Sequence, residues 1–179
     1  MLLSWGKPKI FVKDKEEAGA IWRLLPTPVE DTTQLETTDG DTVEAKIEGG
    51  AVEDVMVKID TYALNFEERL VKGRKKCFAD VEGVVKHNYE VFLQPEDETA
   101  YGLHIHTGRV SVSDSYSAAD GFKQAVSIKA LANNTTTQIE IGVVTVTGTA
   151  GSYSPTIVPI TAASETSVDS DDASNVPTA

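Results

Sequence analysis

The chain has 179 residues, a formal net charge of −12 at pH 7 and hydrophobic residues at 40% of its positions. This length is enough for one domain with a real core. The charge argues against proteins that hold nucleic acid through clustered lysine and arginine, and against docking on anionic lipid. Cys77 is the only cysteine, which excludes an intrachain disulfide and favours folding in a reducing compartment.

The amino-terminal segment predicts a short strand and no targeting signal. Residues 1–12 lack the long apolar run of a signal peptide, and no stretch of the chain is apolar for long enough to span a membrane. We therefore expect no membrane partner. Residues 9–12 (KIFV) predict a strand, and Pro26 and Pro28 end the next apolar segment.

Residues 41–70 carry the clearest alternation of apolar and polar side chains in the sequence. The apolar members flank Gly49-Gly50 and are Val43, Ala45 and Ile47 on one side and Val55, Val57 and Ile59 on the other. This pattern predicts a β-hairpin with a loop of about six residues. It also predicts one apolar face and one charged face, which suits the wall of a barrel.

The alternation changes phase after the hairpin. Val57 and Ile59 are odd-numbered, whereas Tyr62 and Leu64 are even-numbered. One extra residue near Asp60-Thr61, a β-bulge, would bring both sets to one face and bend the strand.

Acidic charge is concentrated around this hairpin. Residues 30–60 contain ten acidic and two basic side chains, a net charge of −8. One interpretation is an ordinary solvated face. The other is a negative surface that repels polyanions.

The rest of the chain predicts a mainly-β fold, a barrel or sandwich, with about eight strands in all. Further strands are expected at residues 89–93, 102–106, 109–116, 122–131 and 138–147. Residues 78–87 predict a short helix or an irregular loop, the one helix expected at most.

The composition changes after residue 147. Residues 1–147 are expected to form the β domain, and residues 148–179 an acidic tail rich in Ser, Thr, Ala and Pro. The tail is expected to be partly extended or disordered, with disorder from about Ala162. Within it, Thr156 to Thr161 is apolar enough to add an edge segment.

Residues that could carry chemistry are few. His104 and His106 share one face of a predicted strand, a spacing that some β-barrel metalloenzymes use. No third ligand is evident, so we interpret them as surface or interface histidines and expect neither a metal nor a cofactor. Basic neighbours could lower the pKa of Cys77, but it has no defined partner and is interpreted as inert. Phosphate-binding loops, nucleophile elbows and zinc-type cysteine spacings are all absent, so we predict no enzyme.

One basic cluster stands out in the acidic chain. It lies in residues 72–76 (KGRKK) and consists of Lys72, Arg74, Lys75 and Lys76. It is either a solvated turn or a contact for the acidic surface of a neighbouring subunit. A nucleic-acid site is disfavoured because no basic groove or interleaved aromatic residues surround it.

Several segments together resemble tail tube (major tail) proteins of long-tailed bacteriophages, and most nearly those of phages and prophages of Bacteroides-type hosts. They are residues 26–50 (PTPVEDTTQLETTDGDTVEAKIEGG), 57–76 (VKIDTYALNFEERLVKGRKK) and 88–97 (NYEVFLQPED), followed by the late strand GVVTV. The resemblance covers roughly residues 1–147 and leaves out the carboxy-terminal tail.

The resemblance implies a β-barrel or sandwich subunit, flanked by a helix, that assembles into hexameric rings stacked as a tube. The long hairpins of neighbouring subunits would line a lumen through which DNA passes without specific binding. Glu44 and Glu48 are then candidate lumen-facing acids, and Lys72, Arg74, Lys75 and Lys76 candidate subunit contacts. Implied partners are other copies of the chain and the tail tip, tape measure and terminator proteins. The implied location is the virion, after assembly in the host cytoplasm.

Three alternatives stay open at this point. One is the tube of a contractile injection or type VI-like system, which would share the fold. Another is an Ig-like binding module displayed on a surface, which the few exposed aromatic residues disfavour. The last is a metal-dependent barrel enzyme built on His104 and His106.

Overall fold

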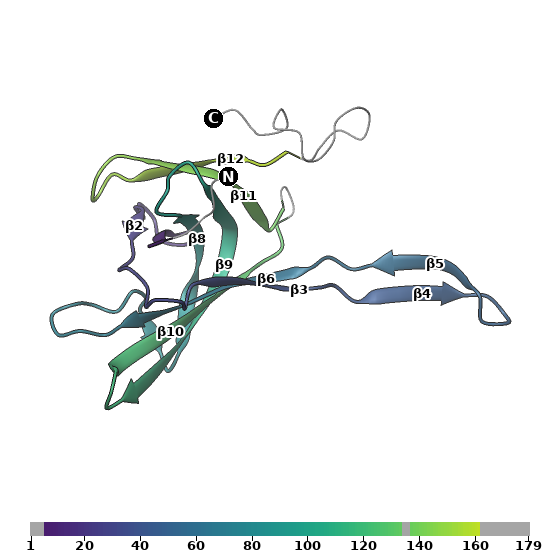
Figure 1. Cartoon of the computed structure of the whole chain (residues 1–179), viewed down its shortest axis with the longest axis horizontal. Helices are drawn as coiled ribbons and strands as arrows, with labels where there is room; N and C mark the ends of the chain where they lie inside the picture. Colours follow the sequence, from purple (N-terminus) through teal and green to yellow (C-terminus); the bar gives the residue numbers. More distant parts are fainter. Residues whose placement is uncertain (1–5, 134–136, 162–179) are drawn as a thin grey trace.

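The computed structural model of the chain (Figure 1) describes residues 6–133 and 137–161. Every helix or strand in these two ranges is a β-strand, which confirms the mainly-β prediction. In chain order the strands are β1 (Lys9–Asp14), β2 (Arg23–Leu24), β3 (Gln34–Thr38), β4 (Thr42–Lys46), β5 (Val52–Val57), β6 (Thr61–Arg69), β7 (Asp80–Val81), β8 (Val84–Gln94), β9 (Tyr101–Ser117), β10 (Gly121–Ala130), β11 (Ile139–Thr147) and β12 (Ser154–Pro159). Within the described ranges, no helix is long and apolar enough to cross a membrane. The disorder expected from Ala162 falls outside the described residues.

Ten strands form one antiparallel sheet, and β4 and β5 form a second sheet of their own. The main path runs β2-β1-β8-β9-β10-β6-β3, with β7 added beside β8 and β11–β12 beside β9. Strands β2 and β3 end this path, so the sheet is open. It curls so that side chains of five strands meet in one core, including Ile10, Val12, Leu64, Phe66, Val91, Ile105, Val110 and Ile128.

The long strand β9 changes neighbours half-way along its length. Tyr101–Ile105 pairs with β11, and Gly108–Ser117 pairs with β10, while β8 lies along the other edge. Gly108, where the pairing with β10 begins, leaves room for Ile128, because a Cβ there would lie 2.4 Å from Ile128 Cγ2. The two strands expected at 102–106 and 109–116 are therefore one strand.

The hairpin β11–β12 covers the face of β1 and β8 that points away from the main core, and so makes a second, smaller core. Phe11 and Phe92 are direct partners across β1–β8 and are buried there with Val144. This explains why the run Ile10–Val12 is apolar without alternation, since both faces of β1 are buried. Strand β12 lies in the stretch assigned to the tail and pairs with β11 at the edge, as expected for the segment near Thr156.

The segment 78–87, for which a helix or irregular loop was expected, contains a β-hairpin instead. Asp80–Val81 pairs with Val84 and Val85 across a two-residue turn. Both turn residues, Glu82 (φ 52°) and Gly83 (φ 83°), have positive φ. Such turns match the right-handed twist of the flanking strands, which favours the hairpin over a helix.

Candidate functional site

The most exposed feature of the molecule is an arm formed by β4, β5 and their turn, residues 42–57. It continues from the end of β3–β6 and projects away from the curled sheet (Figure 1). Strands β4 and β5 pair only with each other, and every residue in both is exposed. The expectation that this hairpin is a wall of the barrel is therefore wrong for the single chain.

The arm keeps the register of its base, so neither strand has an extra residue between the two. Thr38 pairs with Thr61 and Thr42 with Val57, which leaves three residues between them on each strand, 39–41 and 58–60. The bulge expected near Asp60-Thr61 is thus absent, and the one register shift in the arm falls between Ala45 and Lys46.

The ladder is interrupted at Gly40, where the two strands approach closely. A Cβ on Gly40 would lie 1.9 Å from the carbonyl oxygen of Lys58, so only glycine fits. The Gly40 N–H donates to the Asp60 carboxylate over 2.9 Å, and Gln138 donates to the Asp60 carbonyl. These contacts join the base of the arm to the main sheet.

This register mixes the two expected faces of the hairpin. Cross-strand partners lie on the same face of a ribbon, and Glu44 pairs with Val55 while Val43 pairs with Met56. The alternation within each strand was predicted correctly, but the pairing joins odd-numbered residues of β4 to even-numbered residues of β5. Neither face of the arm is purely apolar or purely charged, contrary to the prediction.

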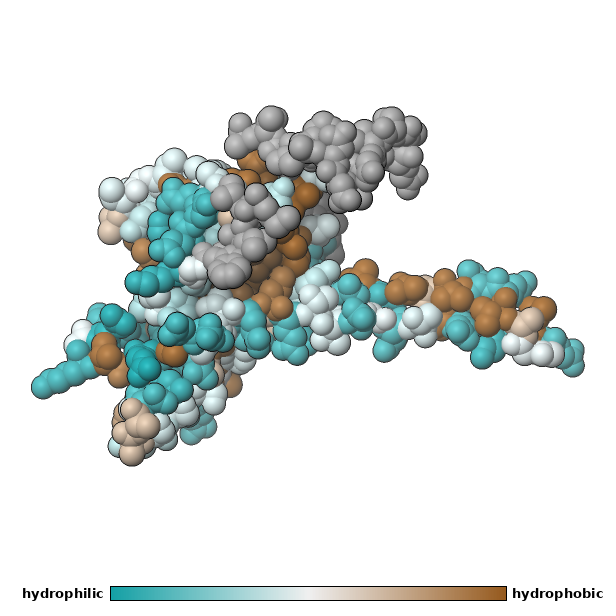
Figure 2. Space-filling view, in the orientation of Figure 1, coloured by the Kyte–Doolittle hydropathy of each residue, from teal (hydrophilic) through white to brown (hydrophobic). Residues whose placement is uncertain are grey.

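The arm nevertheless exposes many large apolar side chains. Figure 2 shows them as brown patches interleaved with hydrophilic residues along its length. The residues on the arm and its base are Val43, Ile47, Val52, Val55, Met56, Val57 and Ile59, all at least 45% exposed. Exposed apolar surface bordered by polar residues is characteristic of a binding surface. The outer edges of β4 and β5 also present unpaired backbone groups to a further strand.

The two predicted lumen residues both lie on the arm. Glu44 is in β4, and its carboxylate is 3.2 Å from Lys46 Nζ in an exposed ion pair. Glu48 is exposed in the turn that follows β4. The arm as a whole carries four acidic side chains and one basic side chain, so its surface is negative.

The basic cluster lies in the connection between β6 and β7. Lys72, Arg74 and Lys75 are exposed there. Lys76 already has partners within the chain, since its Nζ is 2.7 Å from Asp114 and 3.4 Å from Asp80. The hydrogen bond to Asp114 raises the pKa of Lys76.

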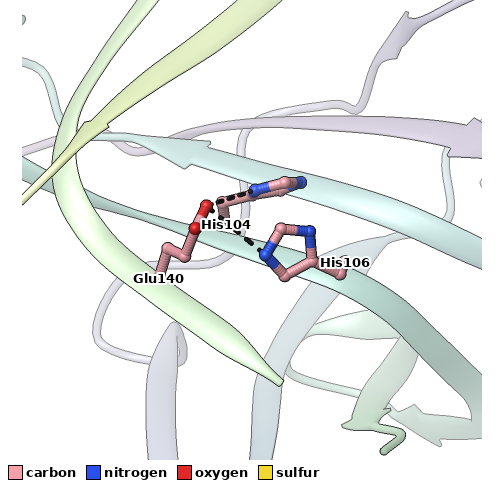
Figure 3. Close-up of side chains that lie close together, drawn as sticks. All are labelled: His104, His106 and Glu140. Atoms are coloured by element: carbon pink, nitrogen blue, oxygen red, sulfur yellow. Dashed lines mark hydrogen bonds and ion pairs between the residues drawn. The ribbon is translucent and has the colours of Figure 1, made fainter. Parts of the chain in front are cut away.

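A second cluster of polar side chains forms where β8, β9 and β11 lie side by side. His104 and Glu140 are direct partners across β9–β11, and His104 Nδ1 lies 3.2 Å from Glu140 Oε2. His106 Nε2 lies 3.4 Å from the same oxygen (Figure 3). One ligand atom from each of the three side chains lies within 4.8 Å of the other two. Glu140 is the third group that the sequence did not reveal.

His104 is held on its other side by β8. Its Nε2 lies 2.8 Å from Glu90 Oε1, and its ring stacks on Phe92 with centroids 3.9 Å apart. Phe92 is its cross-strand partner, and Glu90 lies two residues earlier on the same face of β8. His104 is only 5% exposed, so its interpretation as a surface histidine is wrong.

His106 lies at the end of the β9–β11 ladder, and its Nε2 atom is buried without a hydrogen bond. Burial, followed by the neighbouring His104, lowers the pKa of His106, although Glu140 and Glu90 oppose this. The 3.4 Å contact of His106 Nε2 with Glu140 Oε2 is an ion pair only when His106 is protonated.

Cys77 is buried beside a buried carboxylate, Glu68. The thiol of Cys77 donates to Glu68 Oε2, and its backbone N–H donates to Glu68 Oε1. Burial, together with the nearby Glu68, raises the pKa of Cys77 well above its usual range. The basic neighbours do not activate this thiol, which agrees with its interpretation as inert.

No protein-family model matches the chain, and no curated protein matches it. The solved structures that are similar to it include the following two. The sheath/tube terminator of an extracellular contractile injection system, PVC, in its extended state is 13% identical over 70% of this chain and 90% of that chain, with a TM-score of 0.49. The cap of the anti-feeding prophage, its tube terminating cap, is 13% identical over 80% of this chain and 95% of that chain, with a TM-score of 0.41. Likenesses at this level carry no argument about function.

Proposed function

We propose that this chain is a structural protein of a phage tail that self-assembles into stacked rings, hexameric as the tail-tube resemblance implies. The observation that carries the proposal is the arm: sixteen residues, 42–57, project from the fold, and every residue of β4 and β5 is exposed. A lone two-stranded ribbon is marginally stable in water. Its apolar side chains and open edges would be buried if each arm packed against the arms of neighbouring subunits.

In such a ring the arms would line a channel, and their net negative charge would face or flank it. Glu48 at the turn and Glu44 on β4 are the acids we assign to the lumen. A negative wall would repel the DNA phosphates, so that DNA passes without being bound. We place Lys72, Arg74 and Lys75 at contacts between subunits, because they are exposed and opposite in sign to the arm.

The test is electron microscopy and light scattering of the purified full-length chain at increasing concentration. Hollow tubes of uniform width are expected, or tubes that appear only when tail-tip components are added as initiators. Val57→Asp should abolish them by placing a charge in the buried arm contact. Val81→Asp is the matched control, because Val81 on β7 is 69% exposed and Val57 is 67% exposed.

Two outcomes would contradict the proposal. Chains that stay monomeric even with tail-tip components would favour a binding module. Discrete single rings that never stack would instead indicate a terminator or cap, the roles named for the two similar structures. Images taken after adding the sheath protein of the same gene cluster would show whether it binds the tube, as in a contractile system.

A further inference from the structure

We propose that His104, His106 and Glu140 form a binding site for a divalent transition-metal ion, with Zn²⁺ as the best match. The site is independent of the arm and of its assembly role. Its three side chains come from two paired strands of a sheet, which is a rigid support for a metal site.

The contacts around His104 call for a positive charge on its ring or beside it, because a carboxylate lies against each ring nitrogen. Glu140 lies against Nδ1 and Glu90 against Nε2. A neutral imidazole has one N–H, so one ring nitrogen must direct a lone pair at a carboxylate. A metal ion bound by His104 Nδ1 and Glu140 removes this conflict. Protonation of His104 would also remove it, and is the competing explanation.

His106 Nε2 makes no hydrogen bond although Glu140 Oε2 lies 3.4 Å away, and this distinguishes the two explanations. His106 Nε2 is buried and has no hydrogen bond, which costs free energy unless something binds it. Protonation of His104 leaves this atom as it is. A metal ion between the three side chains would bind it together with Glu140 Oε2, which lies 3.4 Å away.

The distances from Glu140 to the two histidines suit a tetrahedral ion, and all three ligand atoms lie within 4.8 Å of one another. With Zn–N and Zn–O bonds of about 2.0–2.1 Å, neighbouring ligand atoms are about 3.3 Å apart. Glu140 Oε2 lies 3.2 Å from His104 Nδ1 and 3.4 Å from His106 Nε2. Three protein ligands leave a fourth position for water. Two imidazoles favour zinc and its neighbours over Mg²⁺ and Ca²⁺, which prefer oxygen ligands.

Glu90 is then a positioning residue. It accepts the Nε2–H of His104 at 2.8 Å, which fixes the tautomer that presents Nδ1 to the metal. Carboxylates placed in this way behind metal-binding histidines orient the ring and raise its basicity. The stack of Phe92 on His104 holds the ring plane.

The experiment is calorimetric titration of the chelator-treated, full-length chain with Zn²⁺, with Mg²⁺ as a competitor. We expect one Zn²⁺ per chain that excess Mg²⁺ does not displace. His106→Gln and Glu140→Gln should each weaken binding at least about tenfold, and Glu90→Gln by roughly 10–100-fold. Substitution with Co²⁺ should give the visible absorption of a four-coordinate site.

His87→Gln is the matched control, because His87 is a histidine outside the cluster, paired with Asp14. It should bind Zn²⁺ as the unchanged chain does. Cooperative thermal unfolding of each metal-free variant would show that the fold is intact. Absence of saturable binding at one ion per chain, equal affinity in His106→Gln, or an equal loss in His87→Gln would each overturn the proposal.

Discussion

His104 and Glu140 are direct partners across the β9–β11 ladder, although 36 positions separate them in the chain. The pairing of the two strands places both side chains on the face of the sheet that also carries Glu90 and Phe92 of β8. This face is otherwise the apolar interior between β8 and the β11–β12 hairpin. A polar cluster is therefore built into the edge of a hydrophobic core.

The aromatic side chains of this smaller core should contribute much of its stability. Phe92 is 4% exposed, stacks on His104 and contacts Trp22 edge-to-face. We expect Phe92→Ala to lower the free energy of unfolding by about 3–5 kcal/mol, because it leaves a cavity between two layers. Phe122 is 57% exposed, and Phe122→Ala should cost less than about 1 kcal/mol. Urea unfolding measures both, and equal losses would contradict the assignment of this second core.

The alternation of apolar residues predicts strands well but not their register. Both strands of the arm were expected where they occur, since their period of two is visible in the sequence. Which side chains share a face depends on the pairing of Val43 with Met56 rather than Val57. A turn longer or shorter by one residue would move the side chains of one strand to the opposite face. Sequence periodicity does not determine which of these pairings forms.

The histidine cluster was beyond sequence reasoning for a similar reason. The spacing of His104 and His106 is a local signal and was recognised. Glu140 is one of 28 acidic residues in the chain, and only the pairing of β9 with β11 selects it. The sequence could have placed Glu90 and Phe92 on one face of their strand, because alternate residues of a strand share a face, but not beside His104.

The contact between Asp14 and His87 should give the protein a pH-dependent stability. His87 Nδ1 lies 2.6 Å from Asp14 Oδ2, and this hydrogen bond raises the pKa of His87 above its ordinary 6.5. Burial raises the pKa of Asp14, but hydrogen bonds from His87 and from two backbone N–H groups outweigh it, and the net pKa is lowered from 3.8. Each partner is thus more than half charged between about pH 4 and pH 6.5.

Stability is lost at both ends of this pH window, through a different group at each end. The contribution of His87 is present below pH 6.5 and is lost as the pH rises through its raised pKa, while that of Asp14 is lost as the pH falls through its lowered pKa. Asp14→Asn keeps an acceptor for the N–H groups of Glu16 and Glu17 but removes the charge. We expect it to return the His87 pKa toward 6.5 in an NMR titration. Unfolding curves should differ most from the unchanged chain between pH 4 and 6.5, and a constant difference at all pH values would refute this.

The thiol of Cys77 should be inert in the folded protein. Burial and Glu68 raise its pKa, so the reactive thiolate is scarce at neutral pH. Alkylation at pH 8 should be at least about 100-fold slower in the folded chain than in denaturant, since each unit of pKa lowers the thiolate population tenfold. Labelling followed by mass spectrometry measures the ratio. Rapid labelling of the native chain would show that the contact with Glu68 does not hold.

The residues of the basic cluster should have two different roles, one in assembly and one in the stability of the fold. Lys72→Glu with Lys75→Glu should weaken ring and tube formation without lowering the monomer Tm, because both side chains are exposed. Lys76→Glu should instead lower the Tm, because it places a third carboxylate beside Asp80 and Asp114. Light scattering and thermal unfolding separate these effects. Normal tubes in the double variant would remove the cluster from the subunit contact.

Removal of the arm should leave folding intact and abolish assembly. Residues 39 and 60 continue the register in which Thr38 pairs with Thr61, so residues 40–59 can be replaced by Asn-Gly, the pair that suits a two-residue hairpin turn. The main sheet should fold with an unchanged Tm, because β4 and β5 pair only with each other. Assembly should be lost at every concentration, since the arm supplies the apolar surface that joins subunits. Tubes formed by the armless chain would mean that the rings are held by the body of the fold, and the lumen would then need a different lining.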